Sequence, residues 1–476
     1  MKKEALRRIP SVDSLLGTEA LKKAAEAFGR EAVVRAARAC LEETRQFILA
    51  GDSLPDDKAE ALRLLGGRIA TRLESQAEPS LRSCINATGV IIHTGLGRAV
   101  LSDEARQAVS DILRGYSMLA VDPDTGRRGD RDDHLSGLIC GLTGAEAATV
   151  VNNNAAATVL ILNTLAQGKE VIISRGQLVE IGGSFRMPDV METSGAILRE
   201  VGTTNKTHLK DYAAAVNEKT GAILRVHHSN YRIVGFAEEP GLEALVELGQ
   251  SRSIPVIDDL GSGALVDLAQ FGLESEPLVK KSIASGASLV CFSGDKLIGG
   301  PQSGIIAGRS ELIVKIKKNP LKRAFRCGKM TIAALEATLR LFINPDKLAE
   351  RHPVYRMLAL KPDELKKRAS RLKNRLKQRL PEGTSIRTLE GGSEVGSGSV
   401  PAQTLPTILL SIKAQRLSAE DLARQLRLSR PPVFTRILKD EVVFDLRTIL
   451  PGEDEAVEHA LVRILNRTQE EIEGSP

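Results

Sequence analysis

Short apolar segments alternate with longer segments of helical character between residues 85 and 310, and this alternation constrains the fold more than any other feature. The apolar segments are ATVV (148–151), VII (171–173), AILRV (222–226), IPVID (254–258), SLVCF (288–292) and GIIAG (304–308). Strands that alternate with helices form βαβ units, in which the strands are parallel. We therefore predict an α/β domain with a mainly parallel sheet, whose ligand binds outside the carboxyl ends of the strands.

The segment before this alternation predicts a separate helical unit. Residues 1–75 are rich in Ala, Leu, Glu, Lys and Arg, which are strong helix formers. Val33, Ala37 and Leu41 recur at helical spacing and predict an apolar face. A break near SQAEPS (75–80) separates this unit from the α/β domain.

The segment after the alternation predicts a smaller α+β unit. A long helix over residues 329–345 leaves the central domain, and a basic amphipathic helix follows over residues 363–380. A hairpin is expected over residues 432–448, with its turn near Lys439 and Asp440. The expected domains are therefore residues 1–75, 76–345 and 346–476.

Composition excludes several classes of protein. The net charge of +6 tolerates an anionic partner without requiring one. The five cysteines form no CxxC pair and no Cys/His cluster, so we expect a reducing cytoplasm and no metal site. No apolar segment follows the charged start MKKEALRRIP, which predicts no signal peptide, and no apolar run is long enough to predict a membrane span.

A lysine follows one of the predicted buried strands. Lys296 stands in SGDKLIGGPQSG (293–304), directly after ASLVCF (287–292). Desolvation at the end of a strand favours the neutral amine, which is the nucleophile that forms Schiff bases. Ser293 offers a hydroxyl to a phosphate. A surface lysine in a glycine-rich loop is the alternative that this motif alone leaves open.

Three asparagines separate another predicted strand from a helix in VVNNNAAATVLIL (150–162). Asn is a strong N-cap, and the first free N–H groups of the helix would then face a ligand. The small side chains of Ala155 and Ala156 let a phosphate approach the backbone beside Asn154. A well-capped helix without a ligand is the alternative.

Two more strand ends carry polar side chains. In PVIDDLGSG (255–263), a carboxylate could pair with a cationic ring nitrogen, but strand alternation lets only one of Asp258 and Asp259 face the ligand. A carboxylate that caps the next helix is the alternative. In HHSNYRIVGF (227–236), Asn230 is an uncharged donor and acceptor, whereas the two histidines are interpreted as ordinary loop residues.

Taken together, the four segments predict pyridoxal phosphate (PLP) bound at strand ends. The helix N-terminus would bind the phosphate, an aspartate would hold the proton of the ring nitrogen, and the lysine would carry the aldehyde. The separation between Asp259 and Lys296 leaves room for one helix and one strand.

The chain resembles the bacterial selenocysteine synthases, the L-seryl-tRNA(Sec) selenium transferases, nearly from end to end. The motifs that carry the resemblance are RIPSVDSLL (8–16), INATGVIIHTGLGRAVLS (85–102), VVNNNAAA (150–157), VEIGGSFRMPDVM (179–191), VGTTNKTHLKDY (201–212), SNYRIVGF (229–236), DLGSG (259–263), SGDKLIGGPQSGII (293–306) and LKRAFR (321–326). The resemblance implies the type I PLP fold: a large domain with a seven-stranded, mostly parallel sheet, a small α+β domain and an N-terminal helical domain.

The resemblance also implies roles for individual residues. Lys296 would be the Schiff-base lysine, and Asp295 would assist the proton and leaving-group steps. Asp259 would pair with the ring nitrogen, and Asn230 would line the cofactor site. The implied pocket for the anionic selenium donor consists of Arg98, Arg323 and Arg326, whose guanidinium groups present planar forks to phosphate oxygens.

The implied reaction converts L-seryl-tRNA(Sec) to L-selenocysteinyl-tRNA(Sec). Water would be eliminated to give an aminoacrylyl-tRNA, and selenophosphate would supply the selenium. Residues 1–75 would recognise the tRNA, and a cytoplasmic homo-oligomer, a decamer built as a pentamer of dimers, would accommodate it. The sequence departs from the expected family pattern at Gly95, Met118, Ala120, Cys327 and Gly328.

Two other functions are weighed against this one. A PLP-dependent lyase or ammonia-lyase acting on a small amino acid or amino sugar would share the fold, but such relatives typically lack the N-terminal helical unit. A non-catalytic tRNA-binding protein would account for the mild basicity, but not for Lys296 beside an aspartate and a second strand-end carboxylate.

Overall fold

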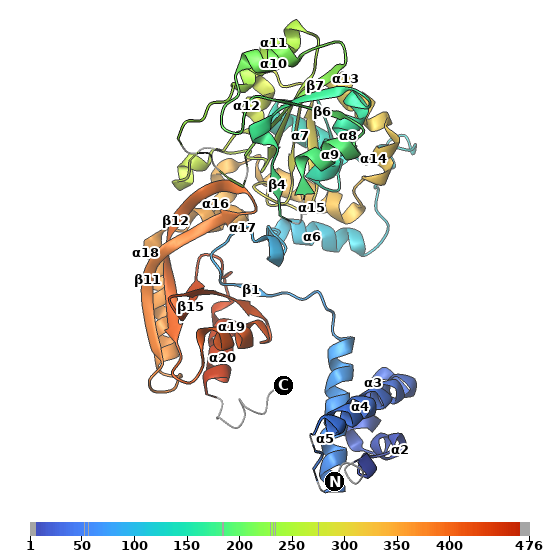
Figure 1. The fold of residues 1–476 in the computed structure, drawn as a ribbon, viewed down its shortest axis with the longest axis vertical. Coiled ribbons are helices and arrows are strands. Elements are labelled where there is room, and N and C mark those ends of the chain that lie inside the picture. The colour runs from blue at the N-terminus through green and yellow to red at the C-terminus, as the bar shows by residue number, and fades with distance from the viewer. Residues whose placement is uncertain are drawn as a thin grey trace. The chain divides into compact units, whose positions relative to one another are not determined.

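The computed structural model describes residues 6–466, apart from residues 52, 56, 183, 184, 229, 232, 234 and 275. The chain divides into two compact units, residues 1–83 and residues 84–476 (Figure 1). The predicted boundary near residue 346 falls within the second unit, and the last ten residues of the predicted C-terminal domain, 467–476, lie outside the described residues.

The first unit is helical throughout its regular elements. Its helices are α2 (Val12–Leu16), α3 (Glu19–Phe28), α4 (Arg30–Ala50) and α5 (Lys58–Ala77). The predicted apolar face of α4 is confirmed, because Val33, Ala37 and Leu41 are buried. They pack in one core with Leu15 of α2 and Leu65 of α5, so this unit has a hydrophobic core of its own.

The second unit contains a seven-stranded sheet with the strand order β2-β10-β9-β8-β7-β3-β6. All neighbouring strands are parallel except at β10, which is antiparallel to both β2 and β9. The strands are β2 (Ala147–Val151), β3 (Glu170–Ser174), β6 (Ile197–Val201), β7 (Thr220–Val226), β8 (Val256–Gly261), β9 (Leu289–Ser293) and β10 (Gly304–Gly308). The predicted seven-stranded, mostly parallel α/β sheet is confirmed.

Helices cover both faces of this sheet. One face packs against α7 (Asp133–Thr143), α11 (Leu242–Ser251), α12 (Val279–Ala284) and α15 (Lys329–Leu341). The other packs against α8 (Asn154–Ala166), α9 (Met187–Thr193) and α13 (Ser310–Lys318). The central strands therefore read as continuous apolar runs in the sequence, because both of their faces are buried.

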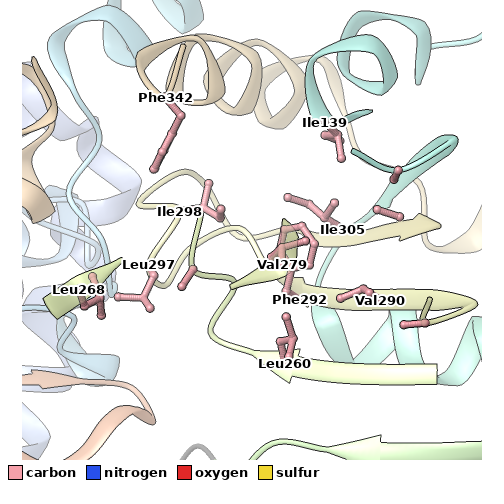
Figure 2. Packing of buried hydrophobic residues seen from close by; sticks show 14 of the residues in the cluster. Ile139, Leu260, Leu268, Val279, Val290, Phe292, Leu297, Ile298, Ile305 and Phe342 are labelled. Carbon is pink, nitrogen blue, oxygen red and sulfur yellow. The ribbon is translucent and has the colours of Figure 1, made fainter. Parts of the chain in front are cut away.

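Alternate residues of each central strand enter different cores. Val290 and Phe292 of β9 pack with Ile305 of β10 in one core (Figure 2). Cys291, between them, belongs to the core on the opposite face. The loop after β9 joins the first core through Leu297, so the segment that carries the predicted lysine is anchored by packing (Figure 2).

A second, antiparallel sheet lies in the C-terminal part of this unit, in the order β11-β12-β15-β14. Its strands are β11 (Ser385–Gly396), β12 (Ser399–Lys413), β14 (Arg436–Leu438) and β15 (Glu441–Asp445). Its apolar face packs with α18 (Pro362–Lys377), α19 (Ala419–Arg427) and α20 (Asp454–Leu465). β1 (Ile85–Asn86) pairs with β13 (Val433–Phe434), which joins the two ends of the unit.

Two local predictions for this part are confirmed. The hairpin of β14 and β15 turns at Lys439 and Asp440, which have φ angles of 50° and 61°. The basic helix is α18, and its apolar stripe is buried.

The remaining elements are η1 (Thr94–Leu96), α6 (Asp103–Leu113), η2 (Arg175–Gln177), β4 (Glu180–Ile181), β5 (Phe185–Arg186), α10 (Leu209–Ala215), η3 (Leu268–Phe271), α14 (Pro320–Ala324), η4 (Pro345–Lys347), α16 (Leu348–Arg351) and α17 (Pro353–Ala359). None of the helices in the described part of the chain combines the length and the apolar character that crossing a membrane requires.

Candidate active site

Lys296 lies in the loop directly after β9, and only 6% of its surface is exposed. Gly299 N donates to Lys296 O at 2.9 Å, and Tyr355 Oη donates to Leu297 O at 3.0 Å. Gly299 has a φ angle of +69°, and a Cβ there would collide with the ring of His352. These contacts hold the backbone of the lysine in place at the carboxyl end of the strand.

Asp259 lies at the end of the neighbouring strand β8 and is buried. Its carboxylate accepts hydrogen bonds from Asn154 Nδ2 at 2.8 Å and from Thr158 Oγ1 at 2.9 Å. Gly261 N donates to the same carboxylate at 3.1 Å. Burial raises the pKa of Asp259, and these three hydrogen bonds act against that increase. The carboxylate is therefore held in one orientation by α8 and by its own strand.

Asp258 points to the opposite face of the sheet. Its Oδ1 accepts a hydrogen bond from Arg225 Nη1 at 2.8 Å, and the side chain is fully buried. Because side chains alternate between the two faces of a strand, only one of the two aspartates can face the ligand site, and Asp259 is the one that lines it.

The N-terminus of α8 provides backbone donors beside these side chains. Asn153 caps the helix, and its Oδ1 accepts from Ala156 N at 2.8 Å. The N–H groups of Asn154 and Ala155 have no hydrogen-bond partner among the described residues, so they are available to an anion. Gly304 of β10 lets the helix approach closely, because a Cβ there would collide with the backbone of Asn153.

These elements surround a cavity of about 260 Å³, which we call the active-site cavity. The predicted site residues that line it are Arg98, Asn154, Ala155, Asp259, Ser293 and Lys296. Its other lining residues are Asn153, Ile181, Gly182, Met187, Val226, His227, Gly261 and Gln302. The carboxyl ends of β7, β8 and β9 thus meet the N-terminus of α8 at one place, as expected for a parallel sheet.

Three of the residues predicted to be catalytic or to bind the cofactor do not line this cavity. Ala156 is buried within α8, where its N–H is occupied by the helix cap. Asp295 is buried behind Arg98, whose Nη1 donates to Asp295 Oδ2 at 2.7 Å. Asn230 is exposed, and its Nδ2 donates to Glu180 O at 2.7 Å. Asn230 therefore contacts β4 rather than the interior of the cavity.

His227 lines the cavity instead, and the sequence reasoning did not select it. It directly follows β7, and its N–H donates to Asp259 O at 2.9 Å. Its Nε2 lies 3.2 Å from a carboxylate oxygen of the buried Glu276. Burial raises the pKa of Glu276, but the contacts with His227, together with hydrogen bonds from Val400 N and Ser262 Oγ, outweigh this and lower it. The pairing of β7 with β8 explains this position. Val226 lies beside Asp259, so the next residue, His227, reaches the same edge of the sheet.

The cavity favours the neutral form of the lysine amine. Burial lowers the pKa of Lys296, and the positive charge of Arg98 lowers it further, whereas Asp259 and Asp295 act in the opposite direction. Within the described residues the amine makes no hydrogen bond or ion pair. Arg98 has a φ angle of 64°, an uncommon conformation that persists only where surrounding contacts maintain it. A lowered pKa makes the neutral amine, which is a nucleophile and a base, easier to form.

The residues present fit PLP. The N-terminus of α8 suits its phosphate, the buried carboxylate of Asp259 suits its ring nitrogen, and Lys296 suits its aldehyde. Asn154 Oδ1 and Asp295 Oδ1 are buried without a hydrogen-bond partner among the described residues, so the site holds polar capacity that the protein itself does not use. The described residues contain no group of His, Cys, Asp or Glu side chains placed to hold a metal ion.

Arg323 and Arg326 line a different cavity of about 620 Å³, which we call the basic cavity. Its lining residues are Ala120, Arg128, Gly129, Asp130, Arg131, Lys317, Lys318, Asn319, Pro320, Lys322, Arg323 and Arg326. The structure therefore brings two of the three predicted donor-binding arginines together, but it does not bring them into the cavity that Arg98 lines.

Comparisons with known proteins agree with this geometry. The family model for L-seryl-tRNA selenium transferase matches residues 84–450, and the model for the N-terminal region of selenocysteine synthase matches residues 6–45. The L-seryl-tRNA(Sec) selenium transferase of Alkaliphilus metalliredigens is 49% identical over 446 residues, which cover 93% of this chain and 95% of the relative. The protein of the same name from Desulfomicrobium baculatum is 46% identical over 461 residues, which cover 97% and 99%.

A solved structure shares the fold. D-glucosaminate-6-phosphate ammonia-lyase aligns with a TM-score of 0.58 at 20% identity, covering 81% of this chain and 96% of that one. The predicted type I fold is thereby confirmed, and at this identity the likeness concerns the fold alone. The near full-length sequence matches go further: the chain belongs to the L-seryl-tRNA selenium transferase family.

Proposed function

We propose that this chain converts L-seryl-tRNA(Sec) to L-selenocysteinyl-tRNA(Sec), with PLP as its cofactor and selenophosphate as its selenium donor. The observation that carries the proposal is the placement of Lys296 opposite Asp259, beside the N-terminus of α8, in a chain that belongs to this family. The likeness to the ammonia-lyase concerns the fold and does not favour a lyase reaction.

Each residue of the active-site cavity has a proposed task. PLP, when bound, supplies an electron sink for the carbanion that forms when the seryl Cα loses its proton. Asn154 and Ala155 donate backbone N–H groups to the phosphate, and Ser293 offers its hydroxyl. Asp259 holds a proton on the ring nitrogen. Lys296 takes the Cα proton and later returns it, for which its lowered pKa suits it.

The leaving-group step is proposed to involve Asp295. The β-hydroxyl leaves with a proton as water, and the selenium of selenophosphate forms a bond to the β-carbon. One water then cleaves the phosphorus–selenium bond and releases phosphate, so that the water lost in the first half is consumed in the second. Asp295 is fixed by Arg98 through Oδ2, which leaves Oδ1 available to assist the proton transfer.

The proposed donor pocket consists of Arg98, Arg323 and Arg326. Because one chain divides these residues between two cavities, we propose that a second copy completes the pocket in the homo-oligomer. The proposed assembly is a cytoplasmic decamer built as a pentamer of dimers. Light scattering should then report ten times the chain mass of 51.3 kDa. Replacing any of the three arginines with Ala should block selenium transfer and spare the reaction of seryl-tRNA with the bound cofactor.

The first unit is proposed to recognise the tRNA. Residues 1–80 contain 14 Lys and Arg against 13 Asp and Glu, so bulk charge does not attract nucleic acid to this unit. We therefore propose that its helices read the shape of the folded tRNA, assisted by a few local basic contacts. Arg35, Arg38 and Arg45 are candidates for these contacts.

The deciding experiment uses the full-length protein loaded with PLP. Serylated tRNA(Sec) and selenophosphate are added, the tRNA is recovered, and the attached amino acid is identified after deacylation. Selenocysteine on the tRNA is the expected result, and Lys296→Ala is the control that should leave serine in place. Serine remaining on the tRNA with the unmodified protein, although PLP is bound, would contradict the proposal.

A further inference from the structure

The basic cavity presents four guanidinium groups that pair with no carboxylate in the described part of the chain. Two of the three lysines on its wall are neutralised, since Lys317 lies 3.1 Å from Asp130 and Lys322 lies 3.1 Å from Asp132. Among the described residues, no carboxylate pairs with any of four arginines of this cavity, which are Arg128, Arg131, Arg323 and Arg326. Positive charges gathered without compensation favour the binding of an anion.

Buried contacts hold this arrangement in place. Lys322 Nζ donates to Val150 O at 2.6 Å and pairs with Asp132, whose carboxylate is also bonded by Thr149 of β2. Asn152 N donates to Phe325 O at 2.8 Å. The segment that carries two of the arginines is thereby fixed against the carboxyl end of β2.

A backbone contact completes the attachment on the other side. Arg131 Nη1 donates to Cys327 O at 2.6 Å, so the loop that carries Arg128 and Arg131 is joined to the end of the same segment. The backbone segments that carry the four arginines, the loop of Arg128 and Arg131 and the segment from α14 to Arg326, are therefore joined to one another and to the end of β2.

The four charges repel one another. The positive charges of Arg131 and Arg323 lower the pKa of Arg326, and Arg128 contributes to the same effect. A bound anion would relieve this repulsion. Among the described residues that line the cavity, no carboxylate pairs with these arginines. Ala120, one of the departures from the expected family pattern, also lines the cavity and adds no charge to it.

The basic cavity lies close to the active-site cavity. Arg326 forms an isolated bridge with Val151, and Asn154, three residues further on, lines the active-site cavity. Three residues of extended chain span at most about 10 Å. The carboxyl end of β2 therefore separates the two cavities by a short distance.

On its other side the active-site cavity adjoins an acidic region. His227 lines both the active-site cavity and a neighbouring cavity of about 380 Å³. That neighbour is also lined by Glu238, Glu239, Glu274 and Glu276. A polyanion that reaches Lys296 is repelled on this side and attracted on the side of the basic cavity.

We propose that the basic cavity binds phosphodiester groups at the 3′ end of the seryl-tRNA, with Arg128 and Lys318 among the residues that contact them. The inference rests on the proposed function and names the part of the substrate that this cavity holds. The selenium donor carries a single phosphoryl group, for which Arg323 and Arg326 suffice with Arg98. Arg128, Arg131 and Lys318 exceed that need, whereas an RNA end supplies several phosphates in a row.

The test compares single charge removals on the full-length protein with PLP bound. Arg128→Gln and Lys318→Gln each remove one exposed charge from the basic cavity. Arg127→Gln is the matched control, because this neighbouring arginine is also exposed but does not line the cavity. The dissociation constant for seryl-tRNA is measured at KCl concentrations from about 50 to about 200 mM.

Each cavity variant should weaken seryl-tRNA binding about three- to tenfold, most strongly at the lower salt concentrations, and reduce the slope of log Kd against log salt by about 0.7. The control should match the unmodified protein in both quantities, and the KM for selenophosphate at saturating seryl-tRNA should be the same in all four proteins. Unchanged slopes in both cavity variants would overturn the inference. A raised KM for selenophosphate with an unchanged slope would overturn it too, because the cavity would then serve only the donor. Failure of the unmodified protein to bind seryl-tRNA would overturn the proposed function itself.

Discussion

Two adjacent aspartates should give opposite phenotypes when each is replaced by asparagine. Asp259 faces the active-site cavity and accepts three hydrogen bonds, whereas Asp258 faces away and pairs with Arg225. The substitution is chemically the same at both positions and differs only in which face of β8 it alters. The comparison therefore separates a contribution to catalysis from a contribution to stability.

The magnitudes follow from the contacts. Asp259→Asn removes a charged partner of the cofactor's ring nitrogen, and a hydrogen bond to a charged group contributes about 1.5–3 kcal/mol, which corresponds to a rate loss of roughly 10- to 150-fold. Stability should change little, because the amide can keep part of the network and no longer bears the cost of a buried charge.

Asp258→Asn leaves the Arg225 guanidinium without its partner. Breaking a buried ion pair costs about 3–5 kcal/mol, and because the Arg225 side chain is 22% exposed we expect the lower end of this range. With an unfolding entropy of about 2.1 cal/mol/K per residue, a loss of about 3 kcal/mol should lower the Tm of the second unit, residues 84–476, by about 4 °C. The rate at a temperature where the variant is folded should stay close to that of the unmodified protein.

The assay combines single-turnover formation of selenocysteinyl-tRNA with thermal unfolding followed by circular dichroism, both on protein saturated with PLP. We expect a slow, stable Asp259→Asn protein and a fast, less stable Asp258→Asn protein. If Asp258→Asn lost more activity than Asp259→Asn at a temperature where both are folded, the assignment of faces would be wrong.

Three further predictions concern other parts of the chain. Borohydride reduction of the yellow holoenzyme should leave the cofactor attached to the peptide that contains SGDKLIGG, and attachment at another lysine would reject Lys296. Deletion of residues 1–83 should preserve PLP colour and abolish the preference for tRNA(Sec) over other seryl-tRNAs, and a retained preference in competition binding would place recognition elsewhere. Burial lowers the pKa of His352 to about 4 from 6.5, so the unfolded chain binds a proton that the folded chain does not, and stability should fall as the pH drops below about 6.5. By pH 5 the loss from this group is about 2 kcal/mol, and His352→Gln should show a correspondingly smaller decrease in Tm between pH 7 and pH 5.

Strands that are buried on both faces could be predicted from the sequence, because they appear there as runs of apolar residues. β9 and β10 are buried on both faces and appear as uninterrupted apolar runs. β6 is an edge strand with mostly exposed side chains, so its sequence ILREV carries no such run. β11 and β12 were not predicted, because β11 contains adjacent glycines and β12 contains two prolines, residues that normally argue against a strand. Long-range pairing along the two strands overrides those local preferences.

The site was predictable where it depends on strand ends and not where it depends on loops. Lys296, Asp259 and Asn154 each stand at the junction of a strand with the next element, and the parallel sheet brings such junctions together. Asn230 stands four residues beyond Val226, the last residue of β7, and the loop carries it to β4 instead. His227 stands at the junction itself. Glu276 carried no signal, because only the folded chain brings it to His227.

The charge arrangement around Lys296 also predicts how the selenium donor changes the lysine. Arg98 lowers the pKa of Lys296 and is the one predicted donor-binding arginine that lines the active-site cavity. An anion bound to Arg98 neutralises that charge, so the pKa of Lys296 must rise. Before the donor arrives the amine is more often neutral and suited to remove the Cα proton, and afterwards it is more often protonated and suited to return it.

Competitive labelling of the PLP-free protein with acetic anhydride measures the pKa of Lys296 directly. Inorganic phosphate should raise that pKa in the unmodified protein. Arg98→Gln should show a raised pKa already and a smaller response, which comes from phosphate at the N-terminus of α8, and an equal response in the two proteins would mean that Arg98 does not bind the anion.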